Sequence, residues 1–136
     1  MQVYREILVA MDCSPVDDAI IGHVTALALQ NEARIHLIHV VHSHTLDQER
    51  ALRERAEKDL SARCALLEEK GIAVRKVIRS GEPDAEILKE IEAADYDLVA
   101  MATHGHSYIG DLLFGSVSRT LKHKISVPLL LIGPGR

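Results

Sequence analysis

The feature of this sequence that most restricts its fold is a regular alternation of short apolar runs with longer segments of helical periodicity. We expect a β-strand at each of the five runs, over residues 5–11, 34–41, 73–79, 97–102 and 127–132. Four of these runs are almost continuously apolar, which is typical of parallel strands buried on both faces. The run at 73–79 is interrupted by charged residues, and this mixture favours a position at a sheet edge.

The segments between the first three runs carry signals for helix starts and ends. Ser14 is expected to cap the first helix, with Pro15 at its first position and the Asp17 carboxylate at its third. Residues 45–48, Thr-Leu-Asp-Gln, have the capping-box pattern for a second helix. Gly71 is placed to end that helix in a left-handed C-terminal cap.

Two further helices complete the alternation. Pro83 opens the third, and the fourth contains Val117 and Leu121 and stops at Pro128. Strict alternation with right-handed crossovers predicts an α/β fold, a doubly wound open sandwich with a five-stranded parallel sheet and four helices. Since 136 residues suit one such unit and not two, we expect a single domain over residues 1–136.

Composition excludes several classes of partner. The formal net charge is −4, and Lys and Arg form no long run, so we expect no nucleic-acid binding. The apolar runs are far too short to span a bilayer, and no secretory signal is visible at the N-terminus, so we expect no membrane partner. Cys13 and Cys64 lie far apart without a Cys-x-x-Cys motif, as expected of reduced thiols, and we predict a cytoplasmic protein.

Candidate metal and redox sites are weak in this sequence. The loop pairs His42/His44 and His104/His106 have no nearby cysteine and no clear carboxylate to complete a ligand set, so we expect no metal site. Cys13 stands near a helix N-terminus, where a thiolate is stabilised, but it lacks a resolving cysteine and a basic neighbour in sequence. A redox role is therefore disfavoured.

A ligand site is expected beyond the carboxyl ends of the strands, where open parallel sheets bind ligands at the point of reversed strand order. Residues 103–116, after the fourth strand, form the most glycine-punctuated stretch of the chain. Gly115 and Ser116 lie near the expected start of a helix, whose free N–H groups favour phosphate. On this pattern alone, a phosphate-binding loop and a flexible loop with turn glycines are equally good interpretations.

Several motifs along the whole chain together resemble the universal stress protein family. They lie at residues 7–14 (Ile-Leu-Val-Ala-Met-Asp-Cys-Ser), 37–41, 81–83, 97–105, 115–117 and 127–130. The resemblance implies the strand order 3-2-1-4-5. It also implies an adenine-nucleotide site, because the family's nucleotide-binding members have a motif of Gly, two residues, Gly, nine residues, Gly and then Ser or Thr.

This chain fits most of that motif, with Gly105, nine residues, Gly115 and Ser116, but Ala102 replaces the first glycine. The resemblance assigns nucleotide contacts to Ala10, Asp12, Val40, Met101, Ala102, Gly105, His106, Gly115, Ser116 and Val117. In that assignment Asp12 and Val40 hold adenine and ribose, and the glycine loop holds the phosphates. Ser14 is the better cap for the first helix, which favours a ligand contact for Asp12.

Two departures from the family's sequence pattern bear on the affinity for nucleotide. The Ala102 methyl stands where the backbone should approach the ligand. His106 replaces the Arg or Lys of many relatives, and a neutral imidazole donates one hydrogen bond without charge, so phosphate affinity should rise toward acid pH.

We therefore favour a universal stress protein that binds ATP or another adenine nucleotide, with or without Mg²⁺, as a stress-response module. The alternative is an interaction protein of the same fold that binds no nucleotide. A phosphoacceptor receiver is rejected, because Ser80-Gly81 stands where its aspartate is needed. No Gly-x-Ser-x-Gly elbow or Walker A lysine motif occurs, so we expect no enzyme, although slow ATP hydrolysis is compatible with the sequence.

Residues 127–132 also predict a homodimer. They form an apolar strand that the order 3-2-1-4-5 places at a sheet edge, and only four residues follow it in this sequence. An open apolar edge is an aggregation hazard unless something pairs with it. Antiparallel pairing of the same strand across a two-fold axis would cover it with one self-complementary surface.

Overall fold

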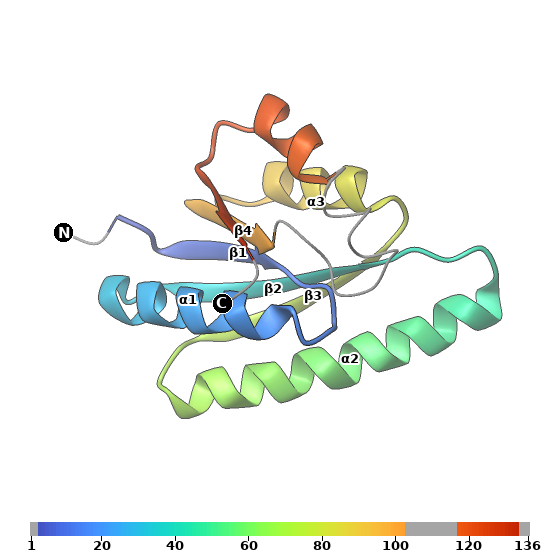
Figure 1. Cartoon of the computed structure of the whole chain (residues 1–136), viewed down its shortest axis with the longest axis horizontal. Helices are drawn as coiled ribbons and strands as arrows, with labels where there is room; N and C mark the ends of the chain where they lie inside the picture. Colours follow the sequence, from blue (N-terminus) through green and yellow to red (C-terminus); the bar gives the residue numbers. More distant parts are fainter. Residues whose placement is uncertain (1–2, 103–116, 134–136) are drawn as a thin grey trace.

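The computed structural model describes residues 3–102 and 117–133. Figure 1 shows strands and helices in alternation along the chain. The elements are β1 (Glu6–Ala10), α1 (Asp17–Asn31), β2 (Arg34–Val41), α2 (Leu46–Glu69), β3 (Val74–Ser80), α3 (Pro83–Ala93), β4 (Leu98–Ala102) and β5 (Leu129–Ile132). Residues 117–124 are also helical and form the fourth helix of the fold. No helix in this part of the chain is long and apolar enough to cross a membrane.

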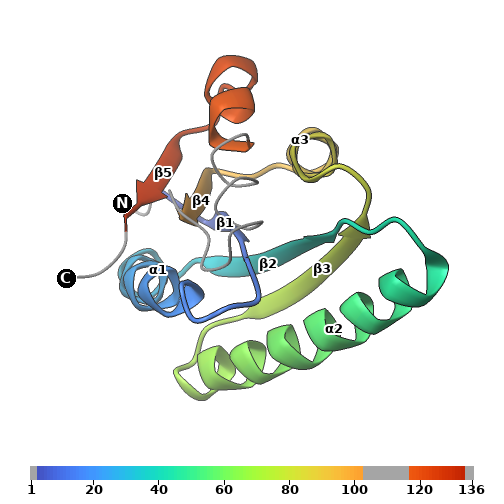
Figure 2. The same ribbon diagram turned by 45° about the vertical axis from the view of Figure 1, so that its right-hand side comes forward.

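The five strands form one parallel sheet in the order β3-β2-β1-β4-β5, which confirms the predicted fold class and strand order. In this register Val9 of β1 lies opposite Leu37 of β2 and Ala100 of β4. Figure 2 shows α1 and α2 on one face of the sheet and α3 with the 117–124 helix on the other. β3, the strand with mixed composition, lies at an edge as predicted.

Both faces of the sheet carry a hydrophobic core, which explains the near-continuous apolar runs. Alternate residues of β1 point to opposite sides, so Ile7 and Val9 pack with α1 and α2, while Leu8 packs with α3. All three side chains are completely buried. A strand of this kind has no solvent face on which polar residues would be placed, and the alternation seen in half-exposed strands is lost.

Most of the helix signals are confirmed. The Thr45 hydroxyl accepts a hydrogen bond from the Gln48 backbone N–H at 3.1 Å, and the Gln48 side chain accepts one from the His44 N–H at 3.0 Å. Gly71 has φ +83°, the left-handed conformation expected of a residue that ends a helix. Pro83 begins α3 as predicted.

The predicted cap of the first helix is wrong. α1 begins at Asp17, and the residue before it, Val16, makes no side-chain cap hydrogen bond. The Ser14 hydroxyl instead donates to Asp12 Oδ2 at 2.5 Å. The sequence argument assumed that Ser14 would cap the helix and that Asp12 would be available to the ligand. Instead Ser14 bonds to Asp12, because a carboxylate two residues away is a stronger acceptor for the hydroxyl than a neutral group.

A polar network crosses the α3 face of the sheet near β3. His36 bridges two charged residues: its Nε2–H donates to Glu6 at 2.7 Å, and its Nδ1 accepts from Arg75 Nε at 2.6 Å. Burial, assisted by the Arg75 guanidinium, lowers the pKa of His36 against the opposing effect of its bond to Glu6. The bond from Arg75 requires an unprotonated Nδ1, which agrees with a neutral ring.

Glu90 of α3 is the acceptor at the centre of this network and is almost completely buried. It accepts hydrogen bonds from the Tyr96 hydroxyl at 2.7 Å and from Arg79 Nη2 at 2.9 Å. Arg75 Nη2 lies 3.4 Å from Glu90 Oε2, the oxygen that also accepts from Tyr96. Burial alone would raise the pKa of Glu90, but the bonds from Tyr96 and Arg79 lower it, so the carboxylate is ionised at neutral pH.

Candidate functional site

A pocket lies at the carboxyl ends of β1 and β2, on the side of the sheet that α3 covers. Its lining comes from β1, β2, the segment after β1, the start of α3 and the start of the 117–124 helix: Ala10, Met11, Asp12, Ile38, His39, Val40, Pro83, Ile87 and Val117. In an open parallel sheet, ligands bind beyond the strand carboxyl ends at the point where the connections from two neighbouring strands lead to opposite faces of the sheet. In the order β3-β2-β1-β4-β5 that point lies between β1 and β4, next to this pocket.

The structure brings four of the predicted nucleotide contacts together in this pocket. Ala10 ends β1, Val40 lies near the end of the neighbouring β2, Asp12 follows β1, and Val117 belongs to the 117–124 helix. Ala10 and Val117 lie near opposite ends of the sequence, so only the fold makes them neighbours.

Two predicted contacts lie deeper. Met101 and Ala102 end β4 and are almost completely buried, and neither lines the pocket. The Ala102 side chain belongs to the core on the α1 side of the sheet. The remaining predicted contacts, Gly105, His106, Gly115 and Ser116, lie outside the described residues.

The segment from Met11 to Ser14 presents Asp12 to the pocket and is held by Asp17. Asp17 Oδ1 accepts from the Asp12 N–H at 2.9 Å, and Oδ2 accepts from the Cys13 N–H at 2.8 Å. Cys13 adopts φ +60°, a left-handed conformation that costs a non-glycine residue roughly 1 kcal/mol or more. The two charge-assisted hydrogen bonds that these N–H groups donate to one buried carboxylate offset that cost.

His39 holds the same segment from β2. Its Nδ1–H donates to the Met11 carbonyl at 2.8 Å, so in the neutral ring Nε2 is an acceptor. His39 also lines the pocket. The sequence does not predict its bond to Met11, because the two residues are 28 positions apart. Asp17 was visible in the sequence only as an acidic residue in the first turn of a helix.

The cysteines show no activation. Burial, and then the neighbouring carboxylates of Asp59 and Asp17, raise the pKa of the Cys13 thiol, with Arg63 opposing them. Burial likewise raises the pKa of Cys64 on α2. A thiol that resists ionisation is a poor nucleophile, and this supports the prediction that Cys13 is not a redox centre.

His42 and His44 are engaged in local contacts, while His104 and His106 lie outside the described residues. His42 Nδ1 donates to the Gly81 carbonyl at 3.3 Å, lies 3.8 Å from Glu82, and its ring meets His44 edge-on at 5.6 Å. Within residues 3–102 and 117–133, no group of three or more His, Cys, Asp or Glu side chains is arranged to hold a metal ion.

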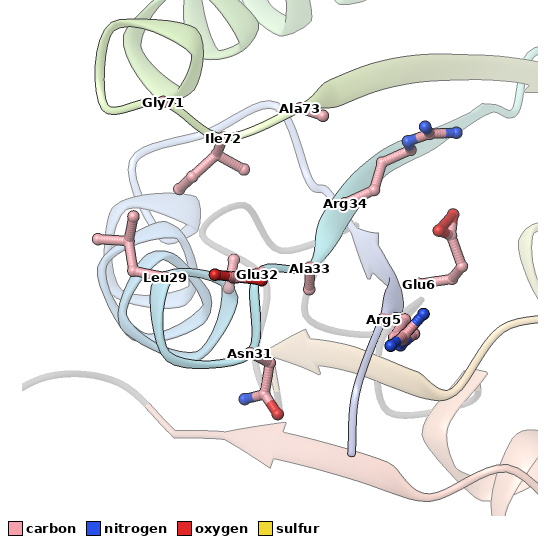
Figure 3. A pocket seen from close by; sticks show the side chains of 11 residues that line it. Arg5, Glu6, Leu29, Asn31, Glu32, Ala33, Arg34, Gly71, Ile72 and Ala73 are labelled. Atoms are coloured by element: carbon pink, nitrogen blue, oxygen red, sulfur yellow. The ribbon is translucent and has the colours of Figure 1, made fainter. Parts of the chain in front are cut away.

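A larger hollow of about 450 Å³ lies at the opposite end of the sheet, where β1, β2 and β3 begin (Figure 3). Its lining mixes both signs of charge with alanine and backbone, including Arg5, Glu6, Glu32 and Arg34. None of the predicted nucleotide contacts that the structure describes lies there. The amino ends of the strands are also not where parallel sheets of this type bind ligands, so the smaller pocket is the candidate site.

Comparison with known proteins gives consistent matches over almost the entire chain. Residues 3–133 match the model of the universal stress protein family. The universal stress protein MJ0577 of Methanocaldococcus jannaschii is 23% identical over 154 residues, covering 96% of this chain and 95% of that protein. Its solved structure superposes with a TM-score of 0.82 at 26% identity, covering 98% of this chain and 99% of that one.

Two further solved structures contain nucleotides. The universal stress protein of Archaeoglobus fulgidus in complex with dAMP is 19% identical, with a TM-score of 0.73 and coverage of 96% and 98% of the two chains. A universal stress protein in complex with cAMP is 17% identical, with a TM-score of 0.64 and the same coverage. At these identities the likeness establishes the shared fold.

Proposed function

The chain belongs to the universal stress protein family, and we propose that it is a cytoplasmic stress-response or signalling module that binds an adenine nucleotide and acts as a homodimer. ATP is the nucleotide we place first, with or without Mg²⁺, and the protein binds it rather than turning it over. The observation that carries the proposal is the convergence of Ala10, Asp12, Val40 and Val117 on one pocket at the carboxyl edge of the sheet.

The pocket has the chemistry that a nucleoside requires. Ile38, Val40 and Ile87 provide apolar surface for a purine ring, and the Asp12 carboxylate provides an acceptor for hydroxyl or amino groups. The family resemblance assigns the phosphates to Gly105, Gly115, Ser116 and Val117, with His106 next to the first glycine. The dAMP and cAMP complexes of two proteins with this fold support an adenine nucleotide as the ligand class.

Nucleotide release and calorimetry test the proposal directly. Acid precipitation of the purified protein should release an adenine nucleotide that is identified by absorbance and chromatography. After the bound nucleotide has been removed, calorimetry should detect ATP binding. Asp12→Ala should weaken ATP binding at least roughly tenfold, because one hydrogen bond to a charged group contributes about 1.5–3 kcal/mol.

Asp95→Ala is the matched control, because Asp95 is exposed and follows the C-terminal end of α3, whereas the pocket is lined by the start of that helix. It removes the same charge and should leave ATP affinity unchanged. Absence of both released nucleotide and measurable ATP binding, with and without Mg²⁺, would instead support the interaction protein that binds no nucleotide.

A second substitution tests the departure from the glycine motif. Ala102→Gly should tighten ATP binding modestly, because the motif glycine gives the backbone at this position more freedom to approach the ligand. It should also lower the free energy of unfolding by about 1 kcal/mol, because it removes a buried methyl from the α1-side core and adds backbone freedom in β4. Calorimetry and urea unfolding separate the two effects. Unchanged or weaker affinity would show that alanine at this position does not hinder ATP binding.

A further inference from the structure

Asp17 is a completely buried carboxylate whose two oxygens are both committed to the backbone beside the candidate site. They accept the N–H groups of consecutive residues, Asp12 at 2.9 Å and Cys13 at 2.8 Å. These two bonds fix the orientation of the peptide groups at Asp12 and Cys13. Asp12 lines the pocket, so these two bonds hold the backbone from which its carboxylate extends.

α2 secures the same segment from the other side through Arg63. Its Nη2 lies 3.4 Å from the Ser14 carbonyl, and its Nη1 and Nε donate to Asp18 at 3.1 Å and Asp59 at 3.0 Å. Among the described residues, the charged and titratable groups that act on Asp17 are Asp12 and Cys13 on its own segment and Arg63 on α2. Arg63 in turn pairs with Asp18 and Asp59, and His39 of β2 holds the adjoining Met11 carbonyl.

We propose that Asp17 is a positioning residue for nucleotide binding: its carboxylate form holds the Asp12 and Cys13 peptide groups so that Asp12 meets the ligand, and protonation of Asp17 releases that hold. This inference rests on the proposed function. A protonated carboxyl keeps a carbonyl acceptor, but its other oxygen becomes a hydroxyl donor that faces an N–H group. One of the two bonds is then lost, and the left-handed backbone at Cys13 is no longer supported.

The pH range of this effect follows from the surroundings of Asp17. Burial raises its pKa to about 6, against the lowering effect of the Asp12 N–H, Arg63 and the Cys13 N–H. The carboxylate therefore predominates above about pH 6 and the neutral acid below it. Nucleotide affinity should fall as pH decreases through this value. A contribution from His106 to phosphate binding would have the opposite sign, because a protonated imidazole attracts phosphate.

The first test needs no nucleotide. In the full-length protein, the NMR signals of the Asp12 and Cys13 amides should shift with a common midpoint near pH 6, and this transition should be absent in Asp17→Asn. Asp47→Asn, an equal change in the first turn of α2, should leave it intact. Amide signals that do not titrate in the wild-type protein would overturn the inference.

The second test uses cAMP as the probe, because its phosphodiester stays ionised from mildly acidic to neutral pH. Wild-type affinity should fall roughly tenfold on acidification through the transition, the loss expected for one charge-assisted bond. Asp17→Asn should bind as weakly as the acidified wild type and show no such loss. Asp47→Asn should follow the wild type.

The outcomes distinguish a failure of this inference from a failure of the proposed nucleotide binding on which it rests. If the wild type binds cAMP or ATP with an affinity that does not fall across the amide transition, Asp17 does not position the site, while nucleotide binding stands. If neither nucleotide binds at any pH, both are overturned. Should Asp17→Asn fail to fold, as circular dichroism would show, the wild-type amide and affinity titrations still decide the question.

Discussion

Replacing Glu90 by alanine should lower the free energy of unfolding by about 2–3 kcal/mol, because it removes the acceptor shared by several buried or half-buried donors. Tyr96 is 7% exposed and would lose the acceptor of its hydroxyl hydrogen. Among the described residues, Arg79 would keep its bond to Glu86. Arg75 is half exposed and regains water, which keeps the loss below that of a fully buried ion pair.

Urea unfolding measures this effect, and Glu92→Ala is its matched control. Glu92 lies on the same helix two positions away, but it is exposed, so its removal should change stability by no more than about 0.5 kcal/mol. Glu90→Gln should fall between the two, because the amide keeps a carbonyl acceptor but turns donors toward Arg79 or Tyr96. Equal stability of the Glu90→Ala and Glu92→Ala variants would show that the network contributes nothing to folding.

Leu131→Glu should convert the proposed homodimer into a monomer. β5 has β4 as its neighbour on one side and no strand on the other among the described residues, as Figure 2 shows. Leu130 and Ile132 pack on the α1-side core and Leu129 on the α3-side core, whereas Leu131 is 43% exposed and joins neither. The structure therefore selects Leu131, rather than Leu130, as the side chain that a partner would cover.

A glutamate at this position would leave a carboxylate buried without a partner in the paired edge, which disfavours association by several kcal/mol. Light scattering at micromolar concentration should give twice the monomer mass for the wild type and the monomer mass for Leu131→Glu. Leu66→Glu is the control, since Leu66 is 55% exposed on α2, away from β5, and this variant should remain dimeric. A monomeric wild type would contradict the homodimer.

The fold class was determined by the sequence alone, because it depends on local patterns. Strands buried on both faces need continuous apolar runs, and helices that cover a sheet need an apolar stripe. The run at 34–41 matches β2 at both ends. The run at 127–132 was predicted two residues too long at its start: Val99 N–H bonds to the Pro128 carbonyl, but β5 begins only at Leu129, since proline has no N–H for the ladder.

The site was only partly accessible to sequence reasoning. Family motifs indicated Asp12 and Val40, and the structure places both in the pocket. The roles of Ser14, Asp17 and His39 required the tertiary structure. Ser14 had several possible partners within a few residues, and local sequence does not say which one its hydroxyl meets. His39 reaches Met11 only because β1 and β2 are paired in one particular register. Local propensity is encoded in neighbouring residues, whereas hydrogen-bond partners and burial depend on which distant residues the packed sheet brings within 3 Å or so of one another.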